Sequence, residues 1–219
     1  MDEVHSDASP MKPTSFEVLL AGGDRRSVGR AELVAAVLRR RPGRLGELID
    51  ALDHPDAVVR MRSADAVEKA TRDAATLLVP HKRRLLRLLE RAPQQEVRWH
   101  LAQIVPRLEL TKQERVRAVA QLTRYLGDTS NIVRVCALPA LADLSQQDGT
   151  LRAHVEATAR ALLRCAAPSL VARSRKVLKQ LSSAPGVGRS RTEAKSRARS
   201  RVPRPVVTPR AGTARSRLR

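Results

Sequence analysis

The sequence predicts an all-α chain in which about four helical hairpins stack into an α-solenoid, with an N-terminal helical extension and a basic C-terminal tail. Apolar residues recur at helical spacing along most of the 219 residues, and no convincing strand alternation is present. Aromatic residues are only 1% of the chain, so Leu, Val, Ala and Ile must build the core, which suits closely packed helices. One pattern also repeats every 36 to 38 residues. A repeat of this length is typical of stacked helical units.

The N-terminal region precedes the repeats. Residues 1–13 are polar and are predicted to be flexible. "SFEVLLA" predicts a short helix that ends at a Gly-Gly pair. "SVGRAELVAAVLRRRPG" predicts a second helix, with Ser27 as its N-cap and the Pro-Gly pair as its stop. These two helices form the predicted N-terminal extension.

The repeat is clearest in the second helix of each hairpin. Its four copies are "VRMRSADAVEKA" from Val59, "VRWHLAQIVPRL" from Val97, "VRVCALPALADL" from Val133 and "LVARSRKVLKQL" from Leu170. We take the second residue of each copy as the reference position. Apolar residues stand one place before it and six, seven and ten places after it, which puts them on one helical face.

Another helical segment precedes each copy of the repeat. These first helices are predicted in "RLGELIDAL", "TLLVPHKRRLLRLLERA", "TKQERVRAVAQLTRYLGD" and "GTLRAHVEATARALLRCA". A single hairpin cannot bury its own apolar stripe, so we expect the hairpins to stack on one another. The predicted solenoid spans residues 14–185.

Two stretches resemble the HEAT repeat: "DHPDAVVRMRSADAVEKA" and "GDTSNIVRVCALPALADL". Each has an Asp-bearing turn, then Val-Arg, then an Ala- and Leu-rich second helix. The resemblance covers roughly residues 44–182, and "LLAGGDRRSVGRAE" and "QQEVRWHLAQIVPRL" are similar to bacterial HEAT-repeat proteins of unassigned function. The chain departs from the pattern at Gln94-Gln95, where the turn Asp is expected, and at Val171, which replaces the reference Arg. The resemblance implies a scaffold that binds proteins or nucleic acids, and it implies no chemistry.

The resemblance also implies that the second helices line a concave groove. On a helical wheel, the residue after each reference position points away from the apolar stripe. These residues, Met61, Trp99, Val135 and Ala172, are predicted to form one rung per repeat, flanked by Arg62, His100, Cys136 and Arg173, and by Lys69 and Arg107. The predicted partner-binding residues are Met61, Arg62, Trp99, His100, Arg107, Val135 and Arg173. Local packing over an adjacent turn is the alternative for Trp99.

The reference arginines Arg60, Arg98 and Arg134 stand at the edge of the apolar stripe. We expect them to be structural, because a planar group with five donors suits carboxylates and helix-end carbonyls of neighbouring units. A ladder of phosphate-binding arginines is the alternative.

No constellation in the sequence predicts catalysis or a bound metal. The five histidines are scattered among the units, and no Cys/His spacing suits zinc. Some HEAT-like proteins are DNA glycosylases that hold a nucleotide between aromatics beside a catalytic acid. This chain has a single Trp, with Gln103 one turn after it. The chain is therefore predicted to be non-enzymatic and to need no cofactor.

The charge of the chain and the composition of its two ends indicate which partners and which location to expect. The formal net charge is +20, and residues 186–219 hold ten Arg, one Lys and one Glu. This tail has too few apolar residues to offset chain entropy, so it is predicted to be disordered. The polar start "MDEVHSDASP" and the lack of an apolar run near ~20 residues predict a soluble, cytoplasmic protein.

These features together predict an interaction scaffold that binds a protein partner through a basic concave groove. An acidic partner fits that charge best. The alternative is a nucleic-acid-binding protein that places the groove and the Arg-rich tail on phosphates.

Overall fold

The computed structural model describes residues 15–164 and 167–183. The flexible start at residues 1–13, Cys165 and the Arg-rich tail lie outside these residues. The chain divides after Pro185, and every described residue lies in the N-terminal part. The described residues form helices, turns and loops with no β-strand, as the sequence predicts.

The helices of the described part follow one another with short connections. They are α1 (Phe16–Leu20), α2 (Ala31–Arg40), α3 (Leu45–Asp50), α4 (Ala57–Thr71), α5 (Lys82–Arg91), α6 (Gln95–Ile104), α7 (Lys112–Tyr125), α8 (Asn131–Gln147), α9 (Arg152–Leu162) and α10 (Pro168–Ser183). Short 3₁₀ turns join several of them, among them Ala51–Asp53, Ala75–His81 and Val105–Arg107. Among these helices, none combines the length and the apolar character that crossing a lipid bilayer requires.

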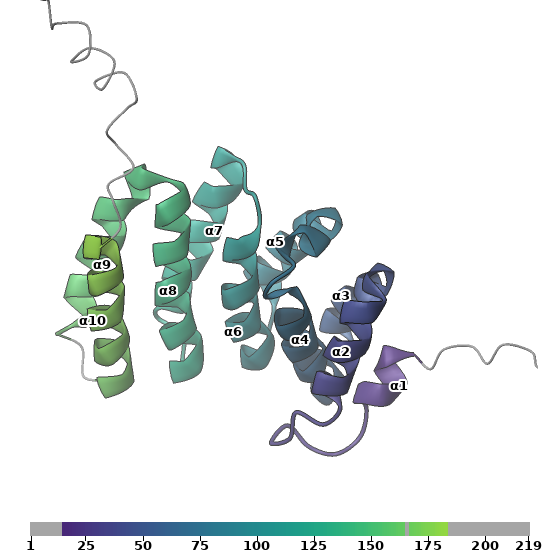
Figure 1. The fold of residues 1–219 in the computed structure, drawn as a ribbon. Helices are drawn as coiled ribbons and strands as arrows, with labels where there is room; N and C mark the ends of the chain where they lie inside the picture. Colours follow the sequence, from purple (N-terminus) through teal and green to yellow (C-terminus); the bar gives the residue numbers. More distant parts are fainter. Residues whose placement is uncertain (1–14, 165–166, 184–219) are drawn as a thin grey trace, which may run out of the picture. The chain divides into compact units, whose positions relative to one another are not determined.

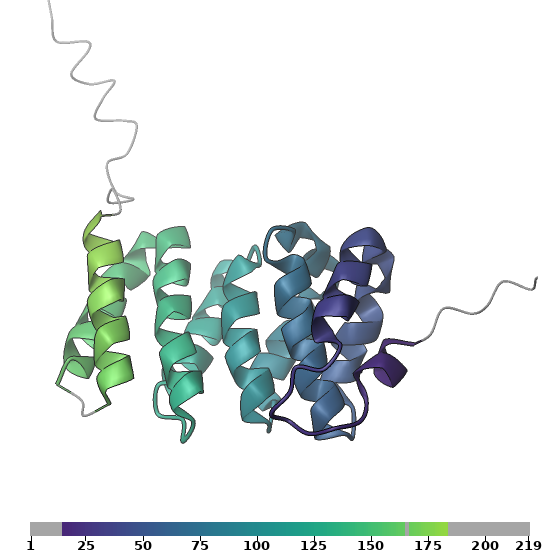
Figure 2. The same cartoon turned by 60° about the horizontal axis from the view of Figure 1, so that its bottom comes forward.

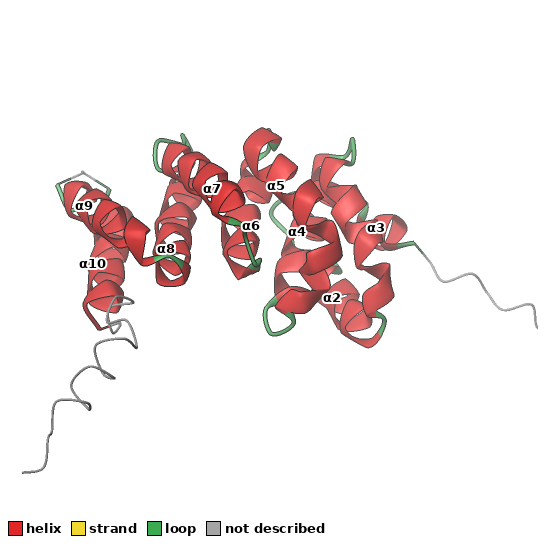
Figure 3. Cartoon of the chain, turned by 90° about the horizontal axis from the view of Figure 1, so that it is seen from above, coloured by secondary structure: helices red, strands yellow, loops and turns green. Residues whose placement is uncertain are grey.

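Four hairpins stack side by side, each made of two successive helices: α3–α4, α5–α6, α7–α8 and α9–α10 (Figures 1 and 2). Seen from above, the first helices α3, α5, α7 and α9 form one row and the second helices form another (Figure 3). The second helices contact each other more extensively than the first helices do, and α2 extends their row by packing on α4. The face of this second-helix row is where the sequence predicts a binding groove.

The core lies between the two rows and is built from the repeated apolar positions. The residues one place before and six places after the reference position are buried in all four units: Val59, Val97, Val133 and Leu170, then Ala66, Ile104, Ala140 and Val177. At seven places after it, Leu178 in the last unit is only partly buried. It belongs to α10, which no further second helix of the described part covers on that side. The four-unit α-solenoid predicted from the spacing is confirmed.

The start of α2 differs from the prediction. Ser27 does not cap the helix, which begins four residues later at Ala31. The hydroxyl of Ser27 instead accepts a hydrogen bond from the backbone N–H of Gly29 at 3.1 Å, and Gly29 has a φ of +53°. A left-handed residue at this place turns the chain before the helix can start, and glycine adopts it without a steric penalty.

Candidate functional site

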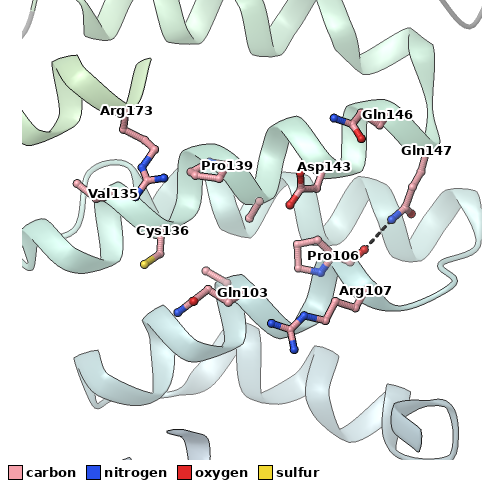
Figure 4. A pocket seen from close by; sticks show the side chains of 12 residues that line it. Gln103, Pro106, Arg107, Val135, Cys136, Pro139, Asp143, Gln146, Gln147 and Arg173 are labelled. Atoms are coloured by element: carbon pink, nitrogen blue, oxygen red, sulfur yellow. Dashed lines mark hydrogen bonds between the residues drawn. The ribbon is translucent and has the colours of Figure 1, made fainter. Parts of the chain in front are cut away.

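A groove lies between α6 and α8 on the face of the second-helix row (Figure 4). Its volume is about 520 Å³, within the range of ligand-binding clefts. The lining comes from α6 and the turn after it, from α8 and from α10: Ala102, Gln103, Pro106, Arg107, Val135, Cys136, Pro139, Ala140, Asp143, Gln146, Gln147 and Arg173. The groove therefore joins three successive repeats.

Two prolines shape the groove. Pro139 lies inside α8 and has no N–H, so the carbonyl of Val135 cannot receive the usual helical bond from four residues ahead. Pro106 lies in the 3₁₀ turn that follows α6, and its carbonyl accepts a bond from Nε2 of Gln147 at 2.6 Å. The groove thus combines an apolar floor with the Val135 carbonyl, which lacks the usual helical donor four residues ahead.

The charges in the groove are mixed. Arg107 donates to the carbonyl oxygen of Glu68 at 2.9 Å and also to its carboxylate, so its charge is compensated within the protein. Burial raises the pKa of Asp143, although a bond from Gln180 and the charge of Arg107 act in the opposite direction. Arg173 has no hydrogen bond or ion pair within the described residues. Its guanidinium group is available to a ligand.

Cys136 lies on the wall of the groove and is a free thiol. Burial raises the pKa of this thiol, and the positive charge of Arg173 lowers it only in part. A raised pKa reduces the thiolate fraction at neutral pH, which is the opposite of what a nucleophilic cysteine needs.

The structure brings Arg107, Val135 and Arg173 together as lining of this groove. Trp99 lies one turn before Gln103, whose side-chain amide donates to the Trp99 carbonyl at 3.2 Å. The indole of Trp99 is half-buried and packs against the core. It does not line the groove, so its surroundings match the local-packing alternative more closely than an open rung.

Three of the predicted partner-binding residues are almost fully buried, so the prediction that they line an open groove is wrong. The exposed fractions are 6% for Met61, 4% for Arg62 and 9% for His100. Arg62 shows the reason: its guanidinium donates to the carbonyls of Leu20 at 2.8 Å, Gly22 at 2.7 Å and Ser27 at 3.1 Å. The segment between α1 and α2 therefore covers this end of the second-helix row.

His100 is enclosed between α4 and α6. Its ring centroid lies 5.7 Å from that of Trp99, with the planes tilted by 52°. Burial lowers the pKa of His100, although the carboxylates of Asp65 and Glu68 act to raise it. Its Nδ1 is buried without a hydrogen-bond partner among the described residues. Nowhere in the described part do three or more His, Cys, Asp or Glu side chains gather as metal ligands would.

Two of the three reference arginines, Arg60 and Arg98, connect successive repeats, whereas Arg134 donates to Oδ1 of Asn131 in its own helix at 3.1 Å. Arg60 donates to Oε1 of Gln94 at 2.7 Å, and Arg98 holds the carboxylate of Asp128 with two bonds, at 2.8 and 3.1 Å. Arg60 also donates to the carbonyl of His54 at 2.6 Å. Gln94, which departs from the expected turn Asp, therefore accepts the same kind of bond from the preceding unit. With these partners inside the protein, Arg60 and Arg98 are not free to bind phosphates.

Three groove residues that matter here were not singled out from the sequence: Pro139, Asp143 and Gln147. A proline inside a helical repeat is a visible signal in "VRVCALPALADL". Asp143 and Gln147 carry no such signal, because their place in the groove depends on the packing of α8 against α6.

Comparison with known proteins identifies the architecture. No protein-family model matches the chain, and no curated protein matches it. An engineered protein solved in a structural genomics programme is similar in fold, with a TM-score of 0.55 and 17% identity over 77% of this chain and 78% of its own. A designed armadillo repeat protein in complex with the peptide (KR)4 gives a TM-score of 0.54 and 15% identity, covering 76% of this chain and 80% of its own. A second designed armadillo repeat protein gives a TM-score of 0.51 and 14% identity over 76% and 80%. The described part of the chain therefore has a HEAT/armadillo-like α-solenoid fold.

Proposed function

We propose that this protein is a non-enzymatic interaction scaffold that binds an extended segment of a protein partner in the groove between α6 and α8. The observation that carries the proposal is the lining of that groove. It joins apolar side chains to the Val135 carbonyl, which lacks its usual helical donor, and to Arg173, which has no hydrogen bond or ion pair within the described residues.

An extended peptide offers alternating N–H and C=O groups, and the groove has partners for both. The Val135 carbonyl, which Pro139 deprives of its helical donor, accepts a bond from a peptide N–H. Gln103 is exposed on the facing wall; one N–H of its amide donates to the Trp99 carbonyl, and the other N–H pairs with a peptide carbonyl. Ala140 and Pro139 provide apolar contact between them.

The charges of the groove select the partner. Arg173 is unpaired within the described residues and suits a carboxylate, which its planar guanidinium holds with two parallel bonds. The designed protein of similar fold carries a basic peptide, (KR)4. The free Arg173 favours a partner segment with an acidic residue at this point.

The groove chemistry supports binding rather than catalysis. The raised pKa of Cys136 disfavours the thiolate. His100, with its lowered pKa, is enclosed between α4 and α6 and does not line the groove. A nucleophile and a general base need to be within hydrogen-bond reach of each other.

A peptide selection tests this function. The full chain is immobilised and a random peptide library is enriched on it, and the selected peptides are then titrated against Val135→Asp and Arg173→Glu. We expect micromolar peptides with at least one acidic residue, and a loss of affinity of roughly tenfold or more in both variants. Val116→Asp is the matched control, because Val116 is 58% exposed on α7, in the other row. If the selected peptides bind all three variants with the same affinity as the original chain, peptide binding in this groove is refuted.

A second function is supported by the composition of the tail. Residues 186–219 hold a net charge of +10, and polycations bind nucleic acids by releasing counterions. We propose that this tail adds sequence-independent affinity for DNA or RNA. Fluorescence anisotropy with labelled duplexes and single strands compares the full chain with a chain ending at residue 185, between about 50 and 200 mM salt. Binding that falls steeply with salt and disappears with the tail is expected; equal binding by the shortened chain would contradict it.

A further inference from the structure

A second, smaller pocket lies on the row of first helices, at α5 and the 3₁₀ turn Ala51–Asp53. Its volume is about 140 Å³. The pocket is lined by Asp53, Arg84, Arg87, Leu88 and Arg91, so three of its five residues are arginines. It shares no residue with the groove between α6 and α8.

The spacing of the three arginines is what brings them together. Arg84, Arg87 and Arg91 stand at positions i, i+3 and i+7 of α5, which at 100° per residue places them on one face of the helix. Like charges three or four residues apart destabilise a helix, as in the pairs Arg84–Arg87 and Arg87–Arg91. Leu88 on the same face is buried and anchors the helix beneath them. The arrangement places three positive charges on one helical face, although the helix would be more stable if they were further apart.

Neighbouring groups orient one arginine and leave the others free. Arg84 pairs with Asp50 at 3.2 Å and with Asp53 at 3.2 Å, while its Nε is buried without a hydrogen-bond partner among the described residues. Within those residues, the side chains of Arg87 and Arg91 have no hydrogen bond and no ion pair. By contrast, Arg117 on the next first helix donates through Nε and Nη2 to the carboxylate of Glu90. The pocket thus contains one guanidinium held in place by carboxylates, that of Arg84, and two that have no partner within the described residues, those of Arg87 and Arg91.

Helix stability explains only part of this arrangement. Arg91 is in the last turn of α5, where a cation interacts favourably with the helix dipole. Arg87 lies one turn earlier, and Arg84 lies in the first turn, where a cation is unfavourable. The dipole therefore accounts for Arg91 and the two carboxylates account for Arg84, which leaves Arg87 without a stabilising partner among the described residues.

We propose that this pocket binds a single phosphate-type dianion, held between Arg87 and Arg91 with Arg84 behind them. Planar guanidinium groups hold phosphate oxygens with paired, charge-assisted hydrogen bonds. The volume is below the ~300–1,000 Å³ of sites for larger ligands, so one such group fits and a larger molecule does not. Asp53 also lines the pocket and pairs with Arg84, so the attraction for an anion comes mainly from Arg87 and Arg91. The site therefore suits an isolated phosphate, free or carried on one side chain, better than a nucleic-acid backbone.

The test uses O-phosphoserine as the probe and unphosphorylated serine as its blank, titrated into the full chain by calorimetry. Saturable millimolar binding of the probe is expected, with no binding of serine. Because the second pKa of a phosphomonoester is about 6, the affinity should rise between pH 5 and 7 as the dianion forms. Arg87→Gln and Arg91→Gln should each weaken binding by roughly tenfold or more.

The matched control is Arg83→Gln. Arg83 is exposed on the same helix, but it does not line the pocket. Its substitution removes the same charge as the substitutions of Arg87 and Arg91. Binding within twofold of the original chain in this variant supports a built site. Equal weakening by all three substitutions would show a diffuse basic surface and overturn the proposal, as would the absence of saturable binding below about 10 mM. Inorganic phosphate and a phosphoserine peptide form the last arm: equal affinities support a free ion as the ligand, and tighter binding of the peptide supports a modified side chain.

Discussion

Replacing Arg62 by Ala should release the N-terminal cap of the solenoid. In the structure this buried guanidinium joins α4 to the segment between α1 and α2, through the carbonyls of Leu20, Gly22 and Ser27. No carboxylate pairs with it among the described residues, so backbone oxygens alone balance its charge. Removal leaves these oxygens without donors and opens a cavity beneath the segment.

The magnitude follows from the exposure of the acceptors. A hydrogen bond to a charged group contributes about 1.5–3 kcal/mol, less where water replaces the donor. Gly22 and Ser27 are exposed and regain water, whereas Leu20 is fully buried. We therefore expect Arg62→Ala to weaken the attachment of the cap by about 3 kcal/mol, equivalent to roughly a hundredfold in the opening equilibrium.

Hydrogen–deuterium exchange measures this opening locally. Amides of residues 16–35 should lose about a hundredfold in protection in Arg62→Ala, while amides of α8 keep theirs. Arg62→Lys should lie between the two, because a lysine keeps the charge and lacks the planar fork. Arg175→Ala is the control, since Arg175 is exposed on α10. Unchanged protection of residues 16–35, or an equal loss along the whole chain, would refute the role assigned to Arg62.

Three other substitutions or reactions have definite expected outcomes. Asp128→Asn should lower the free energy of unfolding at pH 7 by about 2 kcal/mol, because it breaks the paired bonds from Arg98. Burial alone would raise the pKa of Asp128, but its bonds hold it below the ordinary value, so this stabilisation is present above about pH 4 and lost on acidification. Denaturant titrations at pH 7 and pH 2.5 check this, and a difference that persists at pH 2.5 would contradict it. Gly29→Ala should lower the melting temperature, because the new Cβ would lie 2.6 Å from the guanidinium carbon of Arg62 at a φ of +53°. In a background without the other cysteine, Cys136 should react with iodoacetamide at pH 7.5 more slowly than free cysteine, since its pKa is raised, and an equal or faster rate would refute this.

The candidate site shows where a sequence pattern stops being informative. The wheel that placed Val135 and Arg173 on the groove also placed Met61 and Arg62 there, since Met61 is equivalent to Val135 and Arg62 is equivalent to Arg173 in their repeats. The structure exposes the first pair in part and buries the second. Equivalent positions in a repeat share a helical face, but their exposure depends on what packs over that face, and the N-terminal segment packs over Arg62 in the first unit.

The reference arginines were predictable from the sequence in part. The sequence predicted their position at the edge of the apolar stripe, and it predicted the kind of partner that a guanidinium takes there. Which partner Arg60 takes was not predicted, because Gln94 lies in the next repeat and only stacking brings it to 2.7 Å.

The sequence by itself determined the helical repeat, the number of hairpins and the residues that form the core. It could do so because the 3.6-residue period and the 36 to 38-residue repeat are local properties, written within and between neighbouring segments. Only the tertiary structure decided which faces stay open and which polar groups lack partners: the groove at Val135, the buried Arg62 and the arginines of α5. These depend on contacts between segments about 30 to 40 residues apart, and such contacts exist only once the hairpins have stacked.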